Sequence, residues 1–385
     1  MKIQKAIRHL SLFSGCGGID IGLNGNFKTN SHFLLKNKNN NKYTLLPKTK
    51  FKTVFANDIK KSSYNFWKKN LIKDHSIFKL GSIVDLVKEH KKKGGIFPSK
   101  IDILTGGFPC QDFSVSGLRK GFKSHKSHLN NYKIINKNET RGKLYLWMKE
   151  VIKITNPKIF IAENVKGLVS MKDVFKIIKK DFENTGSGYK IYAKELYAPD
   201  YGIPQSRKRI FFIGVSEEFI KKNKLNLTEE DLFPDVEFSN VVNQYPKAKY
   251  FFKNLKEPEL ENKDLSQMYY SKAKYTKGTQ GQIEVNENGI APTIRSEHHG
   301  NIEFRFLKKK NGGKNINPKN KQRRLTVREC ARIQTFPDNL KFIFNIGSKD
   351  GIAASNAYKL IGDAVPPLLA YKIAKKIEKI LIKFS

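Results

Sequence analysis

Short apolar runs that end at glycine or acidic turns recur through the first half of the sequence and again near its end. They predict five buried strands, at residues 7–13, 51–56, 101–105, 158–162 and 210–214. Runs of this length bounded by turn residues are typical of strands inside a sheet. Apolar residues at helical spacing predict helices, among them 141–154 and 368–384. The alternation of strands and helices predicts an α/β fold.

The repeating pattern lapses in three places. Residues 26–50 are rich in Asn and Lys and predict an insertion or a long surface loop. Residues 118–140 are polar and basic, and so long a loop is usually functional or disordered. From 216 to 322, aromatic clusters and short apolar pieces replace the α/β repeat. We therefore expect a main domain at 1–215, a second domain at 216–322, and a return to the first at 323–385.

The charge balance favours a polyanionic partner. The chain has 385 residues and a formal net charge of +38, from 73 Lys and Arg against 35 Asp and Glu. Nucleic acid is the first candidate, although an A/T-rich genome would account for about half of the lysines. The three cysteines fit neither a disulfide framework nor a zinc site. Without a signal peptide or an apolar run of membrane length, a cytoplasmic, reducing location is expected.

Three turns that follow predicted strands carry candidate chemistry. Cys110 comes after Gly-Gly-Phe-Pro at the end of strand 101–105, where open α/β sheets bind ligands. Taken alone, such a cysteine is more often buried and inert. Glu163 ends strand 158–162, and from position alone it could equally be an ordinary acid at a helix entry. Asp58 ends strand 51–56 and could bind a ribose, cap the next helix, or do both.

The sequence around these residues resembles that of the cytosine-5 DNA methyltransferase family. Phe-Pro-Cys-Gln followed by Ser-x-Ser-Gly, at 108–117, is similar to the family's nucleophile motif. Further motifs follow the family's order: Phe-x-Gly-x-Gly-Gly at 13–18, Glu-Asn-Val at 163–165, Gln-x-Arg-x-Arg at 205–209, a helical motif at 323–338, and Gly-Asp-Ala-Val at 362–365. The resemblance implies a doubly wound, mostly parallel methyltransferase sheet and a smaller target-recognition domain made mainly of β-strands and loops.

The resemblance also implies roles for individual residues. Cys110 would be the nucleophile and Glu163 the acid that holds the cytosine, with Arg209 on its exocyclic oxygen and Arg207 supporting the site. S-adenosyl-L-methionine would be bound by Phe13, Ser14, Gly15, Cys16, Gly17, Gly18, Asp58, Ile59, Ser82, Ile83, Pro109, Leu144, Asp363, Ala364 and Val365. DNA would be bound by Gln111, Ser114, Ser116, Lys120, Gln280, Thr293 and Arg295, with Arg305 a further candidate. No metal is expected.

Two positions depart from the family pattern. Ser82 stands where the family usually has the Asp that binds adenine, and Asp363 replaces the usual Asn and cannot donate as an amide does. Two other readings therefore stay open: an RNA methyltransferase of the same family, and a decayed scaffold that only binds DNA. The long stretch 216–322 favours double-stranded DNA as substrate, and intact Cys110, Glu163 and Arg209 favour an enzyme. A monomer that pairs with a restriction endonuclease is the family-level expectation.

Overall fold

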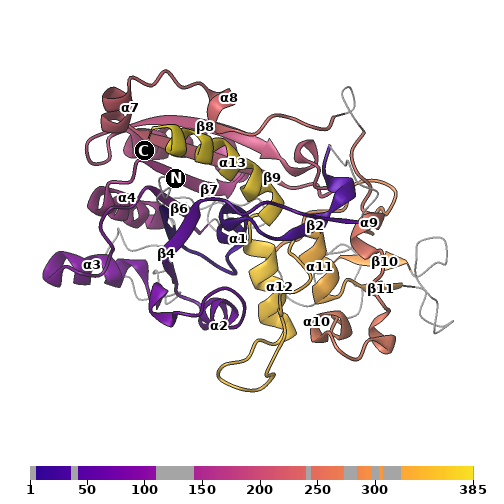
Figure 1. Cartoon of the computed structure of the whole chain (residues 1–385). Coiled ribbons are helices and arrows are strands. Elements are labelled where there is room, and N and C mark those ends of the chain that lie inside the picture. The colour runs from indigo at the N-terminus through magenta and orange to yellow at the C-terminus, as the bar shows by residue number, and fades with distance from the viewer. Residues whose placement is uncertain are drawn as a thin grey trace, which may run out of the picture.

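A seven-stranded sheet forms the centre of the protein, as a computed structural model shows (Figure 1). The structure describes residues 6–35, 42–109, 143–239, 244–272, 284–296, 303–306 and 322–384. The strand order is β5-β4-β1-β6-β7-β9-β8. Their bounds are β1 (Ile7–Leu12), β4 (Phe51–Asp58), β5 (Phe78–Leu80), β6 (Ile103–Gly107), β7 (Ile159–Val165), β8 (Tyr189–Tyr197) and β9 (Lys208–Ser216). Neighbours from β5 to β7 are parallel, whereas β9 is antiparallel to both β7 and β8. The predicted mostly parallel α/β sheet is confirmed.

Helices cover both faces of this sheet, which explains the apolar strands. In β9, Phe211 and Ile213 pack into one hydrophobic cluster, and Ile210 and Phe212 into another on the opposite face. The first cluster includes α1 (Gly18–Asn24), α2 (Lys61–Asn70), α12 (Ala354–Asp363) and α13 (Pro367–Lys383). The second includes α3 (Ile83–Lys93), α4 (Leu144–Thr155) and α6 (Lys172–Glu183).

The chain between β9 and α12 builds small elements. Their bounds are α7 (Glu217–Asn223), α8 (Glu229–Leu232), α9 (Lys249–Phe252), α10 (Leu265–Met268), β10 (Phe304–Phe306), β11 (Gln322–Arg324) and α11 (Val327–Ile333). Helix α7 packs against β9, and α8 packs against α13. By contrast, α9, α10, β10 and β11 gather beside α11, at one end of the molecule (Figure 1). The two short strands β10 and β11 form an antiparallel pair.

The prediction of a surface loop at 26–50 is wrong for the residues that the structure describes there. Phe27, Phe33 and Leu46 are buried, and a small hairpin forms from β2 (Lys28–Asn30) and β3 (Tyr43–Leu45). The Phe33 ring lies 4.8 Å from that of Phe251 in α9. The sequence pattern did not predict this burial, because the few apolar residues are scattered among many Asn and Lys residues. Within the described ranges, no helix is long and apolar enough to cross a membrane.

Candidate active site

The carboxyl ends of β6 and β7 form the centre of the site. The two strands are parallel, and Gly107 is paired in register with Glu163. A Cβ atom on Gly107 would lie 3.1 Å from Oε2 of Glu163, so the carboxyl group lies directly beside the end of β6. The Asn164 amide donates to the carbonyl of Phe108 at 3.0 Å. This bond fixes the backbone two residues before Cys110, which itself lies outside the described residues.

Glu163 lies in an environment that favours its protonated form. Its side chain is buried, and burial raises its pKa above the ordinary value, against the opposing charges of Arg209 and Arg207. Nε of Arg209 lies 3.1 Å from Oε1 of Glu163. Among the described residues, no donor is aligned for a hydrogen bond to that oxygen. Once it takes up a proton, a buried carboxyl group in this position can donate to a ligand.

Arg207 and Arg209 have different surroundings, although one residue separates them. Arg207 is buried, and its guanidinium donates to the carbonyls of Ile294, Gly362 and Ala364 at 2.9, 3.1 and 2.8 Å. It therefore joins β9 to two distant segments of the chain, and its supporting role in the reaction stays a prediction. Arg209 faces Glu163 instead and is partly exposed, so it remains accessible to a ligand.

A glycine turn follows β1 and meets an acid at the end of β4. Phe13, Gly15 and Gly17 have φ angles of 51°, 53° and 70°, a backbone conformation that favours glycine. The Gly15 amide donates to Oδ2 of Asp58 at 2.9 Å, and the Lys60 amide donates to Oδ1 at 2.8 Å. Both Asp58 oxygens keep a further lone pair for a ligand. Among the described residues, no neighbour lies within 4 Å of a Cβ built on Gly15, which leaves space there for a ligand beside the turn.

The other predicted cofactor residues lie on neighbouring elements. Ser82 caps α3 by accepting from the Val84 amide at 3.2 Å, so its hydroxyl proton remains available, and Ile83 is buried. Ile59 is 41% exposed, which is unusual for an apolar residue beside a buried acid, and it would be covered by a ligand. Leu144 begins α4 and is buried. Asp363 ends α12, and Ala364 and Val365 follow it.

Of the three cysteines, the structure describes two, and both are unreactive. Burial raises the pKa of the Cys16 and Cys330 thiols, so neither forms a thiolate readily. The Cys16 thiol donates to the Leu360 carbonyl at 3.2 Å, which leaves only its backbone for a cofactor. Cys110 is the candidate that remains for a nucleophile.

Two residues predicted to bind DNA, Thr293 and Arg295, lie in a segment that packs on the residues around Arg207. The Ile294 amide donates to Oε1 of Gln205, and the Thr293 hydroxyl donates to the carbonyl of Ser206. A Cβ on Gly362 would lie 2.2 Å from the Arg295 backbone, so only glycine allows this close approach. Four of the predicted DNA contacts, Gln111, Ser114, Ser116 and Lys120, lie outside the described residues, as does Gln280.

The expectation that Arg305 reads DNA is wrong. Its side chain is buried and lies 2.8 Å from Glu329 and 3.1 Å from Glu287, in ion pairs that join β10 to α11 and the segment before β10. Arg323 pairs with Glu329 from β11 at 2.7 Å. Sequence gave no sign of this burial, because every partner lies in another element. Arg295 is different: it pairs with Glu303 but is partly exposed.

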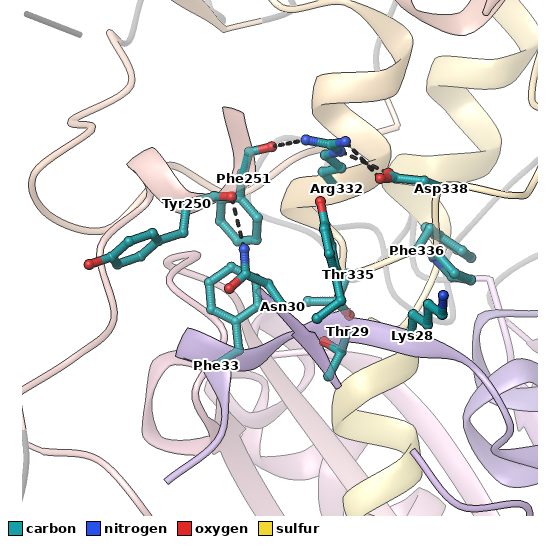
Figure 2. Close-up of a pocket in the computed structure, with 12 residues that line it drawn as sticks. Lys28, Thr29, Asn30, Phe33, Tyr250, Phe251, Arg332, Thr335, Phe336 and Asp338 are labelled. Atoms are coloured by element: carbon teal, nitrogen blue, oxygen red, sulfur yellow. Dashed lines mark hydrogen bonds and ion pairs between the residues drawn. The ribbon is translucent and has the colours of Figure 1, made fainter. Parts of the chain in front are cut away.

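A small pocket lies between the β2–β3 hairpin, α9 and the end of α11 (Figure 2). The Asn30 amide donates to the Tyr250 carbonyl at 3.2 Å, and Arg332 bridges the Phe251 carbonyl and Asp338. Its volume is about 30 Å³, room for roughly two water molecules. It therefore serves as a junction between segments, and a substrate would not fit.

The sheet order, the glycine turn after β1 and the acid after β4 define the class of S-adenosylmethionine-dependent methyltransferases. A family model described as "C-5 cytosine-specific DNA methylase" matches residues 7–379. The chain belongs to this family. It is 30% identical to the Type II methyltransferase M.NgoPII of Neisseria gonorrhoeae, over 97% of this chain and 95% of that protein. It is also 30% identical to M.FnuDI of Fusobacterium nucleatum, over 97% and 94%.

Solved structures support the fold. The chain superposes on S. pombe Dnmt2 methyltransferase with a TM-score of 0.59 and 16% identity, covering 98% of this chain and 99% of that one. The Entamoeba histolytica methyltransferase EhMeth gives a TM-score of 0.54 at 16% identity, with the same coverage. The protein is thus a DNA cytosine-5 methyltransferase that uses S-adenosyl-L-methionine.

Proposed function

We propose that Cys110, Glu163 and Arg209 perform the methyl transfer on a cytosine that has been flipped out of duplex DNA. The observation that carries this proposal is the position of Glu163, which is buried at the end of β7 beside Gly107. Gly107 precedes Cys110 by three residues. Glu163 and Arg209 face one another at 3.1 Å, which gives a cytosine both a proton donor and a cationic group.

The residues have complementary roles in this reaction. The Cys110 thiolate adds to carbon 6 of the ring while protonated Glu163 donates to ring nitrogen 3, so that carbon 5 becomes nucleophilic. The bound cofactor supplies the methyl group as an electrophilic sulfonium. A base from the site or from solvent then takes the proton of carbon 5, and the electrons of that C–H bond expel the sulfur from carbon 6 as a thiolate. Nitrogen 3 returns its proton to Glu163, which restores the aromatic ring. Arg209 contributes to holding the exocyclic oxygen, and it stabilises negative charge on the ring.

We also propose that the enzyme is the modification half of a restriction–modification system and acts as a monomer. The names of M.NgoPII and M.FnuDI as Type II methyltransferases support the first point. The target-recognition domain is proposed to lie within 216–322, where α9, α10 and β10 gather beside α11. Arg295 and Thr293 lie where this stretch meets Gln205 and Ser206, and we propose that they contact the DNA.

The test is methyl transfer to a duplex DNA library, with bisulfite sequencing as the readout. The unaltered protein is expected to convert cytosines at one short sequence, and a tRNA substrate should accept no methyl groups. Cys110→Ser and Glu163→Gln should abolish methylation while DNA binding persists. Normal methylation by Cys110→Ser would refute the assignment of the nucleophile, and preferential methylation of tRNA would refute DNA as the substrate.

A further inference from the structure

An ion pair joins two segments that are far apart in the sequence. Lys60 lies between β4 and α2, and Asp363 is the last residue of α12. Nζ of Lys60 lies 2.7 Å from Oδ2 of Asp363. The two side chains are 47% and 37% exposed, and pairs this exposed contribute little to folding stability. Stability therefore does not explain the arrangement.

The pair lies beside three of the segments that the resemblance assigns to the cofactor. The Lys60 backbone amide donates to Asp58, and the other oxygen of Asp58 accepts from Gly15 in the glycine turn. A Cβ atom built on Gly18 would lie 2.3 Å from the carbonyl oxygen of Val365. The segment after Asp363 is therefore packed against the start of α1. The pair thus links the glycine turn after β1, the end of β4 and the segment that follows α12.

The charges of the pair match one end of the cofactor. The amino-acid end of S-adenosylmethionine carries one carboxylate and one ammonium group. Asp363, in place of the neutral Asn of the family motif, brings a negative charge that would repel that carboxylate if it were alone. Lys60 balances this charge. Burial lowers the pKa of Lys60, but Asp363 and Asp58 more than offset burial, and the side chain stays charged.

We propose that Lys60 and Asp363 together bind the amino-acid end of S-adenosylmethionine, Lys60 the carboxylate and Asp363 the ammonium group. This inference rests on the proposed placement of the cofactor at the glycine turn. It makes Lys60 a cofactor-binding residue, and it accounts for an acid at position 363. Sequence reasoning missed Lys60, because its partner lies at the other end of the chain.

The experiment measures binding of S-adenosylhomocysteine to the full-length protein by calorimetry. Lys60→Ala is expected to weaken binding roughly three- to tenfold, as for one partly screened charge interaction. Lys61→Ala is the matched control, because Lys61 lies 3.9 Å from Asp350 and both side chains are more than half exposed. It should leave the affinity unchanged.

A second ligand separates direct binding from a general structural effect. Methylthioadenosine lacks the amino-acid end, so Lys60→Ala should bind it as tightly as the unaltered protein does, which also shows that the variant is folded. Equal losses for both ligands, or no loss for either, would overturn the role of Lys60. If the unaltered protein bound neither ligand, the cofactor site itself would be misplaced, and the proposed function would fail together with this inference.

Discussion

Replacing Arg207 by Met should separate the supporting arginine from the reacting one. The change removes a buried guanidinium that donates to three backbone carbonyls, at Ile294, Gly362 and Ala364. Each carbonyl left without its donor costs about 1–3 kcal/mol. Relief from burying a charge offsets part of this sum, which leaves a net destabilisation of about 3 kcal/mol.

Urea denaturation followed by circular dichroism measures this loss. With a slope of about 3 kcal/mol per molar urea, the midpoint should fall by about 1 M. Because Arg207 also joins the Ile294 backbone, beside the proposed DNA contacts Thr293 and Arg295, to the end of α12, DNA affinity should fall in the same variant even under conditions where it is folded. The matched control is Arg209→Met, which should lose methylation but be destabilised less than Arg207→Met, because it removes one ion pair rather than three hydrogen bonds to distant carbonyls. An unchanged midpoint and unchanged DNA affinity in Arg207→Met would refute the reasoning.

Three further changes test other parts of the structure. Gly362→Ala places a methyl group 2.2 Å from the Arg295 backbone and should weaken DNA binding and slow methylation. In Gly81→Ala the added methyl meets no described residue within 4 Å, so this variant should be as stable as the parent in thermal denaturation. Phe33→Ala should cost about 3–4 kcal/mol in urea denaturation, because the ring is buried against Phe251, whereas exposed Leu35→Ala in the same segment should cost under about 1 kcal/mol; equal effects would contradict the packing of this segment. Burial raises the pKa of Asp20 from 3.8 to about 7, so folding favours its protonated form, and the stability this provides is lost as pH rises from about 4 through 7. The free energy of unfolding of Asp20→Asn should therefore rise relative to that of the parent between about pH 5 and pH 8. Parallel curves of stability against pH would contradict this.

Within the central sheet, sequence predicted the five inner strands and missed the two at its edges. Strands β6, β7 and β9 are largely apolar, and β1 and β4 carry shorter apolar stretches, because helices cover the sheet on either side. Strand β8 lies at the sheet edge and alternates buried residues with Lys190 and Lys194, so it lacks such a run. Strand β5 has three residues, too few to form a pattern. Edge position and length, rather than composition, explain both omissions.

The residues of the site were predictable where their chemistry lies within one short motif. Glu163 and Asp58 each end a buried strand, and parallel strands bring such ends to one edge of the sheet. Residues that act through a distant partner gave no signal. Arg305 has the composition of a DNA contact, and only its burial against Glu287 and Glu329 shows that it holds the fold together. Local sequence carries no record of that burial.

The return of the chain is what makes the site complete. Helix α12 delivers Gly362 to the Arg295 backbone and Asp363 to Lys60, while α13 packs against α1 directly behind the glycine turn. Arg207 binds the carbonyls of both Gly362 and Ala364, so the strand that carries Arg209 is tied to the same turn. A shift of this one segment would therefore disturb Lys60, Arg209 and the backbone around Arg295 together. This coupling explains why Gly362 is closely packed and why Arg207 is buried here. Both residues hold the segments together, and neither needs to touch a substrate.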